Sequence, residues 1–360
     1  IRIQEKDNVA IALDRIEKGT KLTDNITAND DIPQGHKIAL ADIPKGGEVI
    51  RYGVILGYAV KDLHKGDWIN EHLLELPQPP DVDELVFTGA PEINLPKAPV
   101  RTFEGYRNKK GGFAGTRNIL AISTTVQCVT GVLNVAVEKM KRELLPKYPN
   151  VDDIVPINHA YGCGVAINAP EAVIPIRALK NIAKNPNFGG ELMVVALGCE
   201  KLTVDMLIDE GDISPDNVII LQEIDGFHAM IDALMKMAEK KLKILNERKR
   251  ETLPLSELCI GMQCGGSDAF SGITANPSAG FAADLLVEAG ATVMFSEVTE
   301  GRDAVHVLAK RCVSEEVVKK LAREMKWYDR YLENGQVDRS ANPTPGNKKG
   351  GLSNIVEKAM

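Results

Sequence analysis

The feature that most limits the fold of this chain is an alternation of apolar runs and amphipathic stretches that begins after Arg101. The apolar runs have the length of strands, and the stretches between them have the apolar spacing of helices. The strand candidates are residues 119–124, 153–158, 192–197, 218–221, 258–262 and 293–296, and the helix candidates are 132–145, 170–183, 226–250, 277–289 and 315–333. Strands that alternate with helices predict α/β layers on largely parallel sheets.

Residues 1–76 follow a different pattern, in which tight turns separate short β-type runs. The turns are IEKG (16–19), IPQG (32–35), IPKG (43–46) and LHKG (63–66), and they predict a small all-β module. Residues 77–100 hold six prolines and few periodic apolar residues, which predicts an extended linker. We therefore expect an α/β middle domain at 101–252 and the start of a second α/β domain at 253–360.

Composition narrows the class of protein. The hydrophobic content of 44% and the charged content of 26% are ordinary for a globular protein. A net charge of −7 argues against a general nucleic-acid binder, which normally has a basic surface. The chain has no apolar run near the roughly 20 residues that span a bilayer, and no secretory signal precedes its first strand. We therefore expect a cytoplasmic protein without a membrane partner.

Four of the six cysteines follow closely after a predicted strand. These are Cys128, Cys163, Cys199 and Cys264. Open α/β sheets bind ligands beyond the carboxyl ends of their strands, so these thiols are candidate ligands or catalytic groups. Thiolates with His159 nearby favour iron or zinc, whereas Glu297 and Glu300 favour a harder ion, and both possibilities stay open. Cys259, in a strand, and Cys312, on a helix, are predicted to be inert core thiols.

The glycine-rich loops suit small anions better than nucleotides. GCGVAINAP (162–170) is not a dinucleotide fingerprint, and GYRNKKGGFAGTRN (105–118) lacks the lysine of a phosphate-binding loop. Cations that could bind a carboxylate are Arg107, Arg117, Arg177 and Lys201. RSANPTPGNKKGG (339–351) is predicted to be a fixed turn rather than a helix, and it offers Asn347 and Lys348 to a polyhydroxy acid. His36 follows a turn glycine and is a candidate acid or base.

Six stretches in the same order resemble the galactarate/altronate dehydratase family. They are IPQGHKIALADIPKGGEVIRYG, TFEGYRN, HAYGCGVAINAP, LGCEK, MQCGGSDAFSGITANP and NPTPGNKKGG, and the resemblance runs from about Asn8 to the last residue. It implies an N-terminal β-clip (SAF) module, a linker, a middle domain used for dimerisation and a Rossmann-like C-terminal domain. Because family members continue beyond the position of Met360, we expect this last domain to be incomplete here.

The resemblance also implies a chemistry: metal-assisted loss of water from galactarate to give 5-dehydro-4-deoxy-D-glucarate, in a homodimer. The implied cofactor is iron, as Fe²⁺ or an iron–sulfur centre, or another divalent cation in its place. We predict the metal ligands Cys128, Cys163, Cys199, Cys264 and His159, the catalytic residues His36, Lys201 and Asp268, and the substrate contacts Arg107, Arg117, Asn168, Ser267, Asn347 and Lys348. The alternatives are a related lyase that acts on altronate or sulfolactate, and a non-catalytic protein that binds sugar acids.

Overall fold

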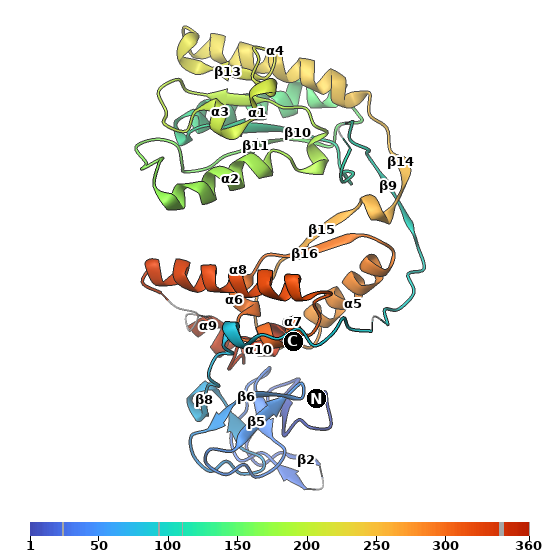
Figure 1. Ribbon diagram of the computed structural model, residues 1–360, viewed down its shortest axis with the longest axis vertical. Coiled ribbons are helices and arrows are strands. Elements are labelled where there is room, and N and C mark those ends of the chain that lie inside the picture. Colours follow the sequence, from blue (N-terminus) through green and yellow to red (C-terminus); the bar gives the residue numbers. More distant parts are fainter. Residues whose placement is uncertain (24, 93, 110, 338–341, 360) are drawn as a thin grey trace. The chain divides into compact units, whose positions relative to one another are not determined.

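The computed structural model describes residues 1–23, 25–92, 94–109, 111–337 and 342–359 (Figure 1). The chain forms two compact units. The first unit comprises Ile1–Lys97, Ile260–Glu288 and Val293–Met360, and the second comprises Ala98–Cys259 and Ala289–Thr292. Among the described residues, no helix is both long and apolar enough to cross a membrane.

The second unit is built on a four-stranded parallel sheet. Its strands are β10 (Ile119–Thr124), β11 (Asp153–Ile157), β12 (Val194–Ala196) and β13 (Val218–Ile220), and their order in the sheet is β11-β10-β12-β13. All four lie within the strands predicted from the sequence. Because the chain moves outward from β10 to β11 and then returns to the other side of β10, the order reverses between β10 and β12. That reversal is where open α/β sheets have their ligand crevice.

Helices cover both faces of this sheet. α1 (Thr130–Glu143) and α4 (Phe227–Asn246) pack together with the sheet in one large apolar core. α1 buries Leu133, Ala136, Val137 and Met140, whose spacing places them on one side of a helix. α2 (Val173–Ile182) and α3 (Val204–Leu207) supply a separate apolar cluster around Val194. A two-stranded antiparallel ribbon of β9 (Thr102–Gly105) and β14 (Glu251–Pro254) completes the unit.

The N-terminal module of the first unit is all β, as predicted. Its strands are β1 (Val9–Ile11), β2 (Lys21–Thr23), β3 (Ile26–Thr27), β4 (Lys37–Ala39), β5 (Glu48–Arg51), β6 (Val54–Ala59), β7 (Trp68–Ile69) and β8 (Leu74–Glu75). They form the sheets β1-β4-β7, β5-β6-β8 and β2-β3. The final glycines of the four predicted turns all have positive φ, between 78° and 93°, which confirms the turns.

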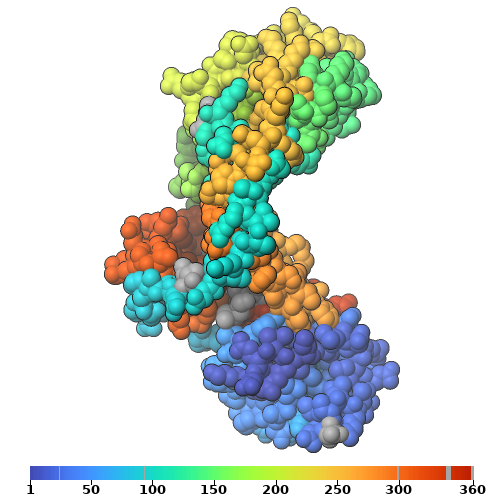
Figure 2. Space-filling view, turned by 90° about the vertical axis from the view of Figure 1, so that its right-hand side faces the viewer, coloured from blue at the N-terminus to red at the C-terminus, as the bar shows by residue number. Residues whose placement is uncertain are grey.

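The proline-rich linker is not uniformly extended, which corrects the sequence prediction. Val82–Glu84 form a short 3₁₀ helix, and Val82 is buried against Val305 and Met325. Figure 2 shows the cyan linker residues beside the orange-red segment that contains α8 (Glu315–Asn334). The physical reason is that DELVF (83–87) carries apolar side chains among the prolines, and these find an apolar surface on α8 and its neighbours.

The remaining elements of the first unit follow β15 (Cys259–Met262). They are α5 (Ala275–Glu288), β16 (Thr292–Phe295), α6 (Val298–Gly301), α7 (Val305–Ala309), α8, α9 (Pro345–Lys349) and α10 (Val356–Ala359). β15 and β16 pair with each other, and all but the first residue of each strand belong to the first unit. The predicted fixed turn at 339–351 is wrong for its second half, where α9 forms. Thr344 and Asn347 make a reciprocal capping box and Pro345 occupies the first turn, which together start a helix despite the glycines. Residues 338–341 lie outside the described part.

Candidate functional site

The carboxyl edge of the parallel sheet gathers three of the predicted thiols. Cys128 lies just after β10, Cys163 in the loop after β11 and Cys199 just after β12. All three are exposed. Because β11 and β12 flank β10, the three loops that follow them emerge side by side at one edge. This arrangement is the one that the strand positions predicted.

Hydrogen bonds join these loops to one another. The backbone N–H of Lys201 donates to the carbonyl of Gly162 over 3.0 Å, and that of Leu202 donates to the same oxygen over 3.3 Å. The hydroxyl of Thr125, after β10, donates to Glu200. A fixed edge of this kind holds the intervening side chains in defined positions.

Glu200 is a member of this edge that sequence reasoning did not assign to the site. Its carboxylate accepts the backbone N–H groups of Leu197 at 3.0 Å and Gly198 at 2.6 Å, besides the Thr125 hydroxyl. Burial acts to raise the pKa of Glu200, but these hydrogen bonds outweigh it and lower the pKa. Its place directly after a buried strand was the available signal, because an acidic side chain there can cap the free N–H groups of the turn.

His159 is held by hydrogen bonds to both of its ring nitrogens. The backbone N–H of Tyr161 donates to Nδ1 over 3.1 Å, so Nε2 carries the proton and donates to the carbonyl of Thr124 over 2.8 Å. A metal could bind His159 only after one of these hydrogen bonds had broken. In this conformation the ring joins the loop after β11 to the end of β10.

The predicted set of five metal ligands is divided between the two units. Cys128, Cys163, Cys199 and His159 belong to the second unit, whereas Cys264 belongs to the first. In the described part of the chain, no three His, Cys, Asp or Glu side chains lie close enough together to hold a metal ion. The five predicted ligands therefore do not form one ligand set in the described residues, and iron binding at the three thiols of the carboxyl edge stays a prediction.

Two of the predicted substrate contacts lie away from the carboxyl edge. Arg117 precedes β10, and a residue before a parallel strand lies at the amino end of the sheet; there it faces Asp152 at 3.9 Å. Arg107 pairs with Glu251 and Glu257, beside the β9–β14 ribbon. By contrast, Lys201 lies at the carboxyl edge, and Asn168 is exposed in the chain between β11 and α2.

His36 lies in the first unit, where the N-terminal module contacts residues near the end of the chain. The indole N–H of Trp68 donates to Nδ1 of His36 over 3.1 Å, so Nε2 is protonated and donates to the carbonyl of Lys349 over 3.0 Å. The imidazole is buried, with 5% of the residue exposed. The two contacts fix both the tautomer and the orientation of the ring.

The loop that contains Cys264 meets the same region. The side-chain amide of Asn347 on α9 donates to the carbonyl of Ser267 over 2.8 Å, and the backbone N–H of Ala269 donates to the carbonyl of Gly350 over 3.0 Å. Asp268 accepts the backbone N–H of Ser271 at 2.9 Å. The thiol of Cys264 lies 3.1 Å from the hydroxyl of Ser267.

These contacts define what we call the His36 site: His36, the loop 264–271 and the segment 345–351. A cavity of about 380 Å³ adjoins it and is lined from the N-terminal module by Pro33, His36, Trp68, Asn70, Glu71 and His72, and from α9 by Pro345, Lys348 and Lys349. Six predicted residues thus belong to one site although they come from three distant stretches of sequence: His36, Cys264, Ser267, Asp268, Asn347 and Lys348.

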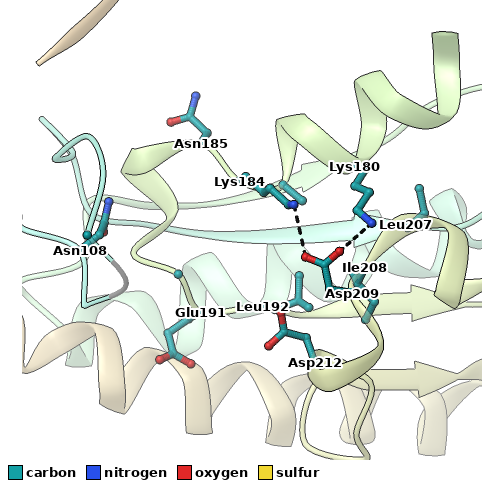
Figure 3. Close-up of a pocket in the computed structure, with 13 residues that line it drawn as sticks. Asn108, Lys180, Lys184, Asn185, Glu191, Leu192, Leu207, Ile208, Asp209 and Asp212 are labelled. Carbon is teal, nitrogen blue, oxygen red and sulfur yellow. Dashed lines mark hydrogen bonds and ion pairs between the residues drawn. The ribbon is translucent and has the colours of Figure 1, made fainter. Parts of the chain in front are cut away.

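A separate cavity of about 310 Å³ lies within the second unit (Figure 3). Lys180 and Lys184 reach the two carboxylate oxygens of Asp209, at 2.7 and 3.3 Å, and these contacts lower the pKa of Asp209. The cavity adjoins Leu192, which precedes β12, so it lies at the amino end of that strand. None of the predicted catalytic, substrate or metal residues lines it.

Cys312 is buried in an apolar cluster, as predicted, but it does not lie on a helix. It follows the end of α7 and packs against Ala309 and Val318, and burial raises the pKa of its thiol. Cys259 begins β15 and is half-buried.

Comparison with known proteins covers nearly the whole chain. Three family models match: the SAF domain of altronate/galactarate dehydratases at residues 1–77, the second domain of D-galactarate dehydratase/altronate hydrolase at 105–246, and the C-terminal domain of D-galactarate/altronate dehydratases at 255–360. The N-terminal match agrees with the β-clip module expected from the sequence, and the mixed α/β multidomain class is confirmed.

Individual relatives agree with these matches. The chain is 54% identical over 371 residues to galactarate dehydratase (L-threo-forming) of Escherichia coli (strain K12), covering 100% of this chain and 71% of the relative. It is 35% identical to altronate dehydratase of Bacillus subtilis (strain 168), covering 100% of this chain and 72% of that protein. It is 30% identical over 269 residues to (2R)-sulfolactate sulfo-lyase subunit beta of Chromohalobacter salexigens, covering 72% of this chain and 63% of that protein.

Proposed function

The chain belongs to the D-galactarate/altronate dehydratase family, and we propose that it is a hydro-lyase that removes water from galactarate. The observation that carries the choice of galactarate is the 54% identity to galactarate dehydratase over the entire chain, against 35% to altronate dehydratase. The product would be 5-dehydro-4-deoxy-D-glucarate.

The reaction has a defined electronic demand. A base removes the proton next to a carboxylate, the neighbouring hydroxyl group leaves as water, and the resulting enol tautomerises to the keto acid. Negative charge builds up on the carboxylate as the proton leaves, so the site needs positioned cations or hydrogen-bond donors. It also needs a proton donor for the departing hydroxyl group.

The His36 site has groups of these kinds. Lys348 and Lys349 line its cavity and can attract a carboxylate, and its volume of about 380 Å³ lies within the usual range for small-molecule sites. His36 presents a protonated Nε2 that a substrate could take over from the Lys349 carbonyl. Asp268 is a carboxylate within the same site. We propose His36 and Asp268 as the acid and base pair of this site, with Ser267, Asn347 and Lys348 as substrate contacts.

The carboxyl edge of the sheet supports a further proposal, that activity requires iron. Three exposed thiols at one edge are the soft ligands that iron accepts. Lys201, at the same edge, remains a proposed catalytic cation. The homodimer and the dimerisation role of the middle domain also remain proposals that rest on the family resemblance, and the cytoplasmic location remains a proposal that rests on the sequence.

The first experiment is turnover of galactarate by the full chain, kept reduced and supplied with ferrous iron, with detection of the keto-acid product. Loss of product on chelation and recovery with ferrous iron would support the iron requirement. Product from altronate or sulfolactate alone would change the substrate and keep the reaction class. Ligand-dependent melting without turnover of any of the three acids would instead favour a binding protein.

The matched variants are His36→Gln and His64→Gln. Loss of a positioned acid or base costs about 10²- to 10⁴-fold in rate, so His36→Gln should lower kcat by that order. His64 is in the same module with a side chain 71% exposed, so His64→Gln should leave kcat unchanged. Equal kcat values for the two variants would remove His36 from the mechanism.

A further inference from the structure

Three charged side chains are almost completely buried beside the His36 site. Lys37, Arg51 and Glu357 have exposed fractions of 0%, 1% and 1%. The Lys37 ammonium lies 2.9 Å from one carboxylate oxygen of Glu357, and the Arg51 guanidinium contacts the other. Buried charges are costly unless they are paired and hydrogen-bonded, so a cluster of three calls for a physical explanation.

The charges of Lys37, Arg51 and Glu357 interact as one electrostatic unit. Burial would raise the pKa of the Glu357 carboxyl, but the charges of Lys37 and Arg51 outweigh that effect and keep the pKa below its usual value. Burial lowers the pKa of the Lys37 ammonium against the opposing attraction of Glu357. We call Lys37, Arg51 and Glu357 the buried triad.

The triad binds one specific segment to the N-terminal module. Besides Glu357, Lys37 donates to the carbonyl of Gly351 over 2.7 Å and to the hydroxyl of Ser353 over 3.1 Å. Glu357 in turn accepts the backbone N–H of Ser353 at 2.7 Å. The amide of Asn354 donates to the carbonyl of Leu56 over 2.9 Å. Residues 351–357 are therefore fixed against β4, β5 and β6.

The fixed segment continues directly from α9, which forms one wall of the cavity. Residue 36 binds the carbonyl of residue 349, and residue 37 binds the carbonyl of residue 351, so two successive side chains set the register of the same segment. The opposite wall carries His36 and Trp68. The relative position of the two walls thus depends on contacts between residues more than 300 positions apart in the chain.

We propose that Lys37, Arg51 and Glu357 are positioning residues, which hold α9 against the N-terminal module so that Lys348, Lys349 and His36 engage a carboxylate of the substrate together. This proposal rests on the proposed dehydration of galactarate at the His36 site. The triad itself is buried and does not touch the substrate. Its effect should appear mainly in substrate binding, because it sets the distance between the two walls.

The test compares Glu357→Gln with Leu63→Ala. Glu357→Gln keeps the shape of the side chain but removes the charge that pairs with Lys37 and Arg51. Leu63 is 1% exposed in the apolar core of the same module. Leu63→Ala is therefore a control that lowers the stability of the module without altering residues 349–357. Both variants are assayed at a temperature where each is fully folded.

A displacement of about 1 Å can cost about 10²-fold in rate, so kcat/KM of Glu357→Gln should fall about 10- to 100-fold. Most of this fall should be a rise in KM, while Leu63→Ala keeps the wild-type KM. A KM of Glu357→Gln equal to that of Leu63→Ala would reduce the triad to a structural role and overturn the proposal.

A second readout does not depend on turnover. Trp68 donates to His36 in the cavity, and replacing the other tryptophan (Trp327→Phe) isolates its fluorescence. Glu357→Gln should change the Trp68 emission and Leu63→Ala should not; an unchanged spectrum would overturn the proposal even if wild-type protein failed to dehydrate galactarate. If Glu357→Gln does not fold, Ser353→Ala removes one acceptor of Lys37, and it should raise KM and change the Trp68 emission in the same direction.

Discussion

A single methyl group at Gly162 should separate the loops that carry the thiols of the carboxyl edge. Gly162 has φ +107°, and a Cβ added there would lie 2.2 Å from the carbonyl oxygen of Thr125. Gly164, two residues later, has φ +65° and nothing within 4 Å of an added Cβ. Comparison of Gly162→Ala with Gly164→Ala therefore separates the free-energy cost of overpacking from that of the backbone conformation.

The expected magnitudes follow from these two geometries. An L-residue in the left-handed region costs roughly 1–2 kcal/mol, which both variants incur. Overpacking against fixed backbone adds about 1–3 kcal/mol at Gly162 alone. Gly162→Ala should therefore lose roughly 2–5 kcal/mol, and Gly164→Ala about 1–2 kcal/mol, before the small gain from a stiffer unfolded chain that both share.

Differential scanning calorimetry of the full chain checks this difference. A domain of 150–250 residues loses about 2–4 °C in Tm for each kcal/mol, so the transition of the second unit should fall roughly 2–12 °C lower in Gly162→Ala than in Gly164→Ala. Because Gly162 also accepts the N–H groups of Lys201 and Leu202, modification of Cys163 and Cys199 by a thiol reagent should change at the same time. Equal Tm values for the two variants would refute the reasoning.

Three further predictions concern other parts of the chain. The folded-state pKa of Glu200 lies below its unfolded value of about 4.5, so its stabilising contribution is present above pH 4.5 and is lost as the pH falls through the folded pKa. The loss of Tm caused by Glu200→Gln should therefore be largest near neutral pH and become smaller in acid. A loss of Tm that does not change with pH would contradict this prediction. Leu133→Ala should cost about 2–5 kcal/mol in urea unfolding, because Leu133 lies fully buried on the face of α1 that packs into the core. Val135 on the same helix is 50% exposed, so Val135→Ala should cost about 0.5 kcal/mol or less. Cys264→Ser should abolish galactarate turnover with an unchanged Tm, while Cys312→Ala stays active; full activity of Cys264→Ser would remove that thiol from the site.

Local pattern was enough to predict the four parallel strands and the helices α1, α2 and α4 of the second unit, and the turns of the N-terminal module, but not β9, β14 or α3. β10 has the predicted bounds, because a run of apolar residues that ends in threonines reads as a buried strand wherever it occurs. The position of Cys128, Cys163 and Cys199 at one edge of the sheet also followed, since the carboxyl ends of parallel strands lie together. The same rule could have placed Arg117 at the amino end, because it precedes β10.

Local pattern predicted the wrong conformation at two places, where a few apolar or capping residues outweighed the effect of prolines or glycines. The prolines of the linker suggested an extended chain, but Val82 is buried against Val305 and Met325 on distant elements. The glycines near residue 350 suggested a turn, but the capping pair Thr344 and Asn347 starts α9. In both cases the amino-acid composition of the stretch favoured one conformation, but contacts of particular side chains stabilised another.

The sequence by itself determined the α/β class, the β module, the family and the residue types available for chemistry, because each depends on short stretches read in order. Only the tertiary structure decided which of those residues meet. His36 reaches Lys349 and Lys37 reaches Glu357 across more than 300 positions, and no periodicity links the members of either pair. Gly162 lies against Thr125 for the same reason. Burial and contact between distant segments are properties of the packed chain, so they appear only when its elements have come together.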